Sequence, residues 1–245
     1  MQSLEDHVVE LRNRLKVVSV FLLASTGFVF YYSADILNWV QADLGFDLNA
    51  LSAYEVFYTE IMIALLGGFL ISLPVVLFQL LKFMRPGLKD HEYRVMRNYL
   101  PFSVVLFAIG AVFAYEFVVK ASLNFFQGTA RAAEVEALWS LQNTVSFALR
   151  LSAFTGIVFQ LPIVSVILGR AGVMDVGMMK EYRAHFIIAV LVLSAFVTPP
   201  DVISQALVTL PVIGLYQISI FLVGKVQQED KEGEAEEEGE DDEGT

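Results

Sequence analysis

The stretch IMIALLGGFLISLPVVLFQLL, residues 61–81, contains no charged side chain and decides the fold class. A helix of this length extends about 30 Å, which matches the thickness of the hydrocarbon core of a bilayer. Five further charge-free apolar runs accompany it, at residues 17–34, 98–115, 151–169, 186–200 and 202–224. The sequence therefore predicts an all-α membrane protein with six transmembrane helices.

The composition favours a membrane protein over a soluble one. Of 245 residues, 56% are hydrophobic and 18% are charged, and the mean hydropathy is +0.60, whereas soluble domains carry about 25% charged residues. The chain has no cysteine, which excludes disulfides, thiolate metal sites and a cysteine nucleophile. Enzyme signatures are missing and the three histidines lie far apart, so we expect no catalytic activity, cofactor or metal site.

The net charge of −11 is concentrated at the end of the chain. Eleven acidic residues and one lysine follow Val226, and the rest of the chain is nearly neutral. A Glu- and Gly-rich segment of this kind predicts disorder. We expect a membrane domain at residues 1–225 and a disordered acidic cytoplasmic tail at 226–245. The tail either keeps the chain soluble at the surface or attracts basic peptides.

The last two apolar runs predict a helical hairpin that turns at Thr198-Pro199-Pro200-Asp201. Run 186–200 is short for a membrane span, so the tip of the hairpin is expected below one membrane surface, with local thinning of the bilayer. Alternatively, this span begins near Met179, and the side chains of Arg183 and His185 reach the surface.

Six spans place both termini on one side of the membrane. Thirteen Lys and Arg residues flank that side and two flank the other. The positive-inside rule therefore predicts cytoplasmic termini and an inner cell membrane protein. Residues 35–60 and 116–136 become long outer loops in this topology.

Residues 3–15 predict an amphipathic helix that lies on the cytoplasmic membrane surface before the first span. One face of this helix carries the apolar residues Leu4, Val8, Leu11 and Leu15. On the charged face, Glu10 is either a free anionic group that can receive a cation or the i,i+4 partner of Arg14.

Other polar residues near or within the spans are candidates for binding. A helix ends at Pro86-Gly87 and another begins near Asp90, so Glu92 lies at the membrane surface, where it either binds a ligand or only stabilises the start of its helix. Gln160 lies within a span and either bonds another helix or faces a cavity. Gln79 and Gln217 are expected to form hydrogen bonds between helices.

Three sequence blocks resemble the signatures of one family. Residues 10–15, ELRNRL, resemble E-L-R-x-R-L; residues 83–92 resemble F-x-x-P-x-L-x-x-x-E; residues 198–205 resemble T-P-P-D-x-x-S-Q. The family is TatC, the core receptor subunit of the twin-arginine protein translocase, and the likeness extends over residues 3–225. Lys120 departs from the pattern, because many members have proline there.

The resemblance implies a membrane receptor and scaffold that binds the paired arginines of signal peptides on folded precursors. It also implies assembly with TatA-type and possibly TatB-type single-span proteins, self-association, contact with membrane lipids and use of the proton-motive force. Nucleic acid is not an expected partner. Glu10 and Glu92 match the carboxylates that would hold two guanidinium groups. Arg12 and Phe83 match positions that shape this site.

The resemblance assigns three further residues to the membrane-embedded part. Gln160 matches a position on a concave face that engages the single-span partner, and Asp201 and Gln205 match the hairpin motif. The alternative function is a small-solute secondary transporter. No acidic residue lies at the centre of a span, so the sequence gives no support for a proton relay.

Overall fold

The computed structural model describes residues 4–243 except 85–89, 171 and 199–200, and the side chains of residues 4–8, 81, 84, 90–98 and 229–243 are also outside the description. The elements in chain order are α1 (Leu4–Tyr31), α2 (Ser33–Leu44), β1 (Leu48–Asn49), α3 (Glu55–Met84), α4 (Asp90–Phe113), the π-helix η2 (Ala114–Val119), α5 (Lys120–Ala132), β2 (Trp139–Ser140), α6 (Leu141–Val158), α7 (Leu161–Arg170), α8 (Val176–Glu181), α9 (Arg183–Val197) and α10 (Val202–Glu243).

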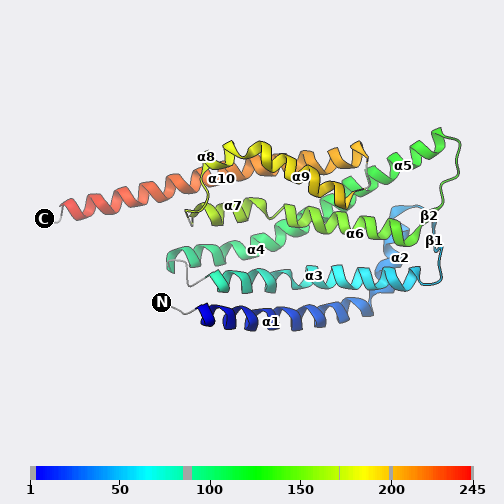
Figure 1. Ribbon diagram of the computed structural model, residues 1–245, viewed down its shortest axis with the longest axis horizontal. Coiled ribbons are helices and arrows are strands. Elements are labelled where there is room, and N and C mark those ends of the chain that lie inside the picture. The colour runs from blue at the N-terminus through cyan, green and yellow to red at the C-terminus, as the bar shows by residue number, and fades with distance from the viewer. Residues whose placement is uncertain (1–3, 85–89, 171, 199–200, 244–245) are drawn as a thin grey trace.

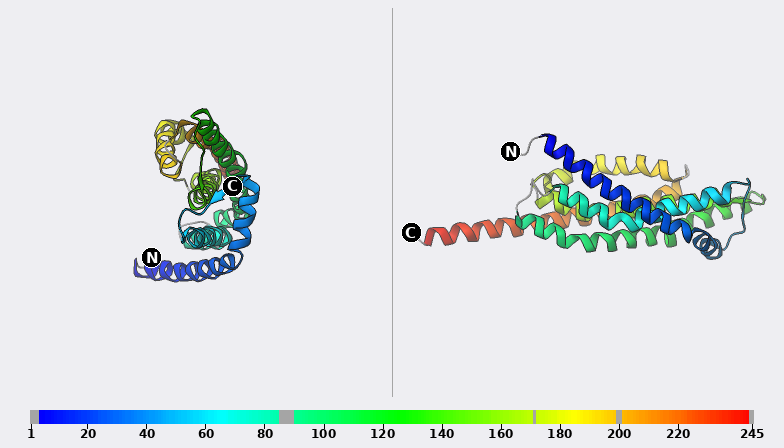
Figure 2. Two further views of the ribbon diagram at one scale, coloured as in Figure 1. Left: turned by 90° about the vertical axis from the view of Figure 1, so that its right-hand side faces the viewer. Right: turned by 90° about the horizontal axis from the view of Figure 1, so that it is seen from below.

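The long helices run side by side along the longest axis of the molecule (Figure 1). The start of α1 and the end of α10 lie at the same end, which we call the terminal end; α2 and the two strands lie at the opposite end, which we call the cap. Seen end-on, the helices form a bent layer that is open on one side (Figure 2, left).

Within the described residues, five helical segments are long and apolar enough to cross a membrane: 9–31, 55–80, 99–132, 141–170 and 202–228. The prediction of a mostly helical membrane protein is confirmed. The short fifth run corresponds to α9, an apolar helix of 15 residues. It begins at Arg183, between the two starts that the sequence allowed, so the six-span topology stays a prediction.

Small residues bring α1 and α3 into close contact. The hydroxyl groups of Ser25 and Ser72 are 2.7 Å apart, and Ser25 Oγ also donates to the Gly68 carbonyl at 2.9 Å. A Cβ atom on Gly68 would lie 2.6 Å from the Cα of Thr26, so only glycine fits there. Small residues allow such close approach of membrane helices, where packing and hydrogen bonds replace the hydrophobic effect.

The predicted outer loops are largely helical, which corrects the expectation for residues 35–60 and 116–136. Helix α2 and helix α5 build the cap, and β1 pairs with β2 in parallel, Leu48 opposite Trp139. Apolar residues of α2 join the main buried cluster, namely Leu37, Val40 and Leu44. A glycine, Gly45 with φ 67°, ends α2 in the left-handed conformation typical of helix ends.

Helix α10 continues as backbone through the acidic segment to Glu243, where the composition predicts disorder. Glu, Lys and Ala extend a helix readily once it has begun. Packing continues beyond residue 225, because Val226 is 6% exposed and Gln227 Nε2 donates to the Met174 carbonyl at 3.2 Å. The division into a membrane domain and a disordered tail stays a prediction.

Candidate functional site

Glu10 forms an ion pair with Arg14 on the first helix. The Nε of Arg14 donates to Oε1 of Glu10 at 3.2 Å, and Nη2 donates to the same oxygen. The Nη1 of Arg14 donates to Oε1 of Gln79 on α3 at 3.3 Å. Of the two roles open to Glu10, the i,i+4 pair with Arg14 is therefore present. The expected interhelical hydrogen bond of Gln79 is also present, whereas Gln217 is exposed.

The serine contact between α1 and α3 explains why Arg14 reaches Gln79. The two helices are antiparallel, and from the Ser25–Ser72 contact Arg14 lies eleven residues back along α1 while Gln79 lies seven residues onward along α3. At 1.5 Å per residue these distances are about 16 and 10 Å. The extended arginine side chain spans the remaining gap of about 6 Å.

A shallow hollow of about 410 Å³ lies beside this ion pair. It is lined by Val9, Glu10, Asn13, Arg14, Val17 and Gln79. The side chain of Glu10 is 29% exposed and that of Arg14 is 19% exposed, so both groups are partly shielded from water. Oε2 of Glu10 accepts no hydrogen bond from any described residue. The hollow thus presents one carboxylate oxygen to which no described residue donates a hydrogen bond.

The other residues predicted for this site lie near the terminal end but are not all brought into the hollow. Arg12 is exposed and does not line it, and Phe83 is half-buried in the last turn of α3. Glu92 lies in the first turn of α4, close to the predicted helix start at Asp90, and its side chain is outside the described residues, as are Pro86 and Gly87. The starts of α1 and α4 share the terminal end (Figure 1).

Gln160 is buried at the break between α6 and α7. It is 8% exposed, and its Nε2 donates to the Ser103 carbonyl of α4 at 2.9 Å, while its Oε1 accepts from the Ser103 hydroxyl. Of the two roles open to Gln160, the hydrogen bond to another helix is the one observed. The sequence did not predict Ser103 as its partner.

Asp201 and Gln205 both hold the hairpin between α9 and α10 together. Oδ1 of Asp201 accepts from the Ser204 backbone amide at 2.7 Å, which caps the start of α10. Gln205 Nε2 donates to the Leu191 carbonyl of α9 at 3.0 Å. The Ser204 hydroxyl reaches Ser122 of α5 at 2.9 Å. Pro199 and Pro200 of the predicted turn lie outside the described residues.

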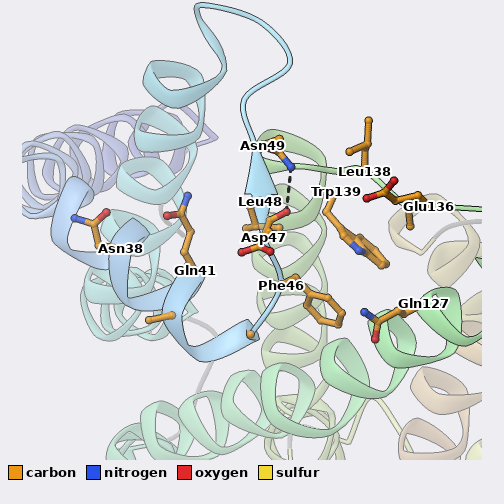
Figure 3. A pocket seen from close by; sticks show the side chains of 13 residues that line it. Asn38, Gln41, Phe46, Asp47, Leu48, Asn49, Gln127, Glu136, Leu138 and Trp139 are labelled. Carbon is orange, nitrogen blue, oxygen red and sulfur yellow. Dashed lines mark hydrogen bonds between the residues drawn. The ribbon is translucent and has the colours of Figure 1, made fainter. Parts of the chain in front are cut away.

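A larger polar hollow of about 940 Å³ lies in the cap (Figure 3). Its wall includes the carboxylates Asp47 and Glu136 and the aromatic rings of Phe46 and Trp139, whose centroids are 5.0 Å apart. The sequence singled out none of these residues, because the expected topology treated both segments as loops. The pairing of β1 with β2 brings them together.

A charged cluster joins α2 to the junction of η2 and α5. The Nζ of Lys120 lies 3.0 Å from Asp43 Oδ2 and 2.8 Å from Glu116 Oε2, and the Tyr115 hydroxyl donates to Asp43 at 2.8 Å. The hydrogen bond from Lys120, with that from Tyr115, lowers the pKa of Asp43. Trp39 stacks on Tyr115 with ring centroids 5.8 Å apart.

Residues 6–211 match the family model described as "Sec-independent protein translocase protein (TatC)". The chain belongs to the TatC family. Members of this family are components of the Sec-independent protein translocase, a transport system. The TatC match covers the ion pair on α1, the buried Gln160 and the hairpin residues Asp201 and Gln205.

The sequences of similar TatC proteins align with this chain over nearly their whole length. The TatC of Campylobacter jejuni is 31% identical over 96% of this chain and 99% of its own length. The TatC of Aquifex aeolicus is 34% identical over 89% and 93%. A crystal structure described as "Twin Arginine Translocase Receptor- TatC" is 34% identical, with a TM-score of 0.81 over 90% of this chain and 99% of that one.

Proposed function

We propose that this TatC protein is the receptor that binds the paired arginines of signal peptides on folded precursors. The observation that carries the proposal is Glu10, a half-buried carboxylate on a hollow near the terminal end, with one oxygen unbonded by any described residue. A guanidinium group is permanently charged and matches a carboxylate in geometry. Partial burial strengthens such a pair relative to one in open water.

Glu92 supplies the second carboxylate in this proposal. It lies in the first turn of α4, and α4 starts at the same end of the molecule as α1 (Figure 1). Two carboxylates on α1 and α4, helices that both start at the terminal end and pack on either side of α3, would together hold two adjacent arginines of one extended peptide. Arg12 and Phe83 are proposed to shape the approach to the site rather than to bind the peptide.

The proposed setting is the inner cell membrane, crossed six times with cytoplasmic termini. The terminal end then faces the cytoplasm, where signal peptides arrive, and the cap faces the opposite side. Single-span proteins of the TatA type, and of the TatB type where present, are the proposed partners, with the proton-motive force as the energy source. Gln160, at the break between α6 and α7, is the proposed contact region for such a helix.

The test is binding of a peptide with two adjacent arginines to the full-length chain in lipid nanodiscs. Glu10→Ala combined with Glu92→Ala is expected to weaken binding at least about tenfold, because each variant removes a charge-assisted hydrogen bond. Glu181→Ala is the matched control, since it removes an exposed carboxylate from α8. Unchanged affinity in the double variant would contradict the proposed receptor function.

A further inference from the structure

The proposed receptor carboxylate already binds a guanidinium of its own chain. Two donors of Arg14, Nε and Nη2, converge on Oε1 of Glu10. This is the same chemical group that an arginine of a signal peptide would bring to the site. Arg14 also lines the hollow, so an incoming side chain meets it directly.

The occupied oxygen limits what Glu10 can offer to a ligand. A bidentate arginine–carboxylate pair uses both oxygens, with two parallel N–H···O bonds. While Arg14 holds Oε1, an incoming guanidinium can bond only through Oε2. It also approaches a second positive charge within the same hollow, which opposes binding.

Gln79 provides Arg14 with a second acceptor. Its Oε1 lies 3.3 Å from Nη1 of Arg14, on the helix opposite Glu10. If Arg14 leaves Glu10, it keeps this hydrogen bond and part of its burial. Displacement of Arg14 therefore costs less than removing an isolated arginine from the same position would cost.

We propose that Arg14 is a built-in competitor for Glu10 and determines both the affinity and the selectivity of the site. This inference rests on the proposed receptor function. A lysine ammonium is compact, strongly hydrated and unable to form the planar fork. It cannot replace a guanidinium that is already in place, so competition with Arg14 makes the site select arginine over lysine.

The test measures the affinity of the full-length chain in nanodiscs for two peptides, one with two arginines and one with two lysines. Arg14→Gln is expected to raise the affinity for the arginine peptide about fivefold, which corresponds to roughly 1 kcal/mol of binding free energy. The affinity for the lysine peptide is expected to rise more, so that selectivity falls. Lys16→Gln is the matched control, because Lys16 is an exposed cation of the same helix that forms no ion pair with a described residue.

A second variant leaves the net charge unchanged. Gln79→Leu removes the second acceptor, so Arg14 depends on Glu10 alone, and the affinity for the arginine peptide is expected to fall about threefold. A purely electrostatic effect of Arg14 predicts no change in this variant. Gln79→Leu thus carries the test even if Arg14→Gln does not fold.

The outcomes separate this inference from the receptor function. If Glu10→Ala weakens binding but Arg14→Gln leaves affinity unchanged or lowers it, the competitor role is wrong and the receptor function stands. An equal rise in Lys16→Gln, or an unchanged affinity in Gln79→Leu, also overturns the competitor role. If Glu10→Ala has no effect on binding, the receptor function itself fails.

Discussion

The Nζ of Lys120 lies 3.0 Å from Oδ2 of Asp43 and ties the helix α2 to the start of α5. The two residues are far apart in sequence, and the pair closes the cap across the end of the membrane helices.

Removal of the ammonium group is expected to loosen α2. The chain has no cysteine, so Val40→Cys, at a position 5% exposed in the native chain, reports how often α2 leaves the core. Lys120→Ala in this background is expected to raise the rate of thiol labelling about threefold, because a partly exposed ion pair contributes a stabilisation of that size. Arg131→Ala, which removes a cation from the same helix, is the control, and an equal rise there would contradict the role of the pair.

The cap is expected to loosen at acidic pH. Hydrogen bonds from Lys120 and Tyr115 lower the pKa of Asp43 from its ordinary value of 3.8, so its ionised form is favoured in the folded protein. The stabilisation that ionised Asp43 provides is complete above pH 3.8. It is lost as the pH falls through the lower pKa that Asp43 has in the folded protein. Labelling of Val40→Cys with an acid-tolerant thiol reagent is expected to rise below pH 3.8. Asp43→Asn is expected to remove that dependence, and a dependence that persists in this variant would assign it to another group.

A side chain at Gly68 is expected to push α1 away from α3. The added Cβ of Gly68→Ala would meet the Thr26 backbone at 2.6 Å, and overpacking of this kind costs about 1–3 kcal/mol. The measurement is the thermal unfolding temperature in detergent. Gly27→Ala is the control, because a Cβ there meets nothing within 4 Å. Equal effects of the two substitutions would show that the close contact is not the cause.

Gln160 and Ser103 are expected to act as one unit. Each satisfies the other's polar groups in a buried site, so a double-mutant cycle of Gln160→Leu and Ser103→Ala should give a coupling of about 1 kcal/mol in the free energy of unfolding. Ser103→Ala removes only the bond from the Ser103 hydroxyl to Gln160 Oε1, so additive effects of the two changes would contradict a contribution of that bond. Binding of a single-span partner by the same variants then tests the proposed contact role separately.

Truncation of the chain is expected to lower its stability only when it removes the first residues of the acidic segment. A chain that ends at Gln228 keeps the buried Val226 and the bond from Gln227 to Met174. A chain that ends at Lys225 loses both and is expected to be less stable by about 1–3 kcal/mol. Comparison of the unfolding temperatures of the two truncated chains in detergent tests this. Equal temperatures would show that the packing beyond residue 225 contributes nothing.

The membrane helices could be predicted from the sequence because charge-free length is a one-dimensional property. The cap helices do not follow from unbroken apolar runs, because charges such as Asp35 and Lys120 interrupt those runs. A helical signal is present, since Leu37, Val40 and Leu44 recur at helical spacing before Gly45.

The contact of Glu10 with Arg14 could be predicted from the sequence, but the contacts between helices could not. Spacing alone allowed the pair of Glu10 with Arg14, because both belong to one helix. The bond from Arg14 to Gln79 depends on how α1 and α3 align, and that alignment is set by the contact of Ser25 with Ser72. The same limit applies to Gln160 and Ser103, which are 57 residues apart.

The π-helix Ala114–Val119 is equivalent to one additional residue inserted into an otherwise regular helix. Each residue turns an α-helix by about 100°. The side chains of α5 therefore point about 100° away from the directions they would have if α4 continued as a regular helix. This rotation directs Ser122 to Ser204 and Lys120 to Asp43. Conversion of this turn to regular α-helix without loss of a residue would misalign both contacts at once, whereas deletion of a single residue would give a regular helix and keep both aligned. The orientation of the cap thus depends on this turn absorbing one additional residue, and a change that makes the turn α-helical at constant chain length affects the cap more than deletion of that residue does.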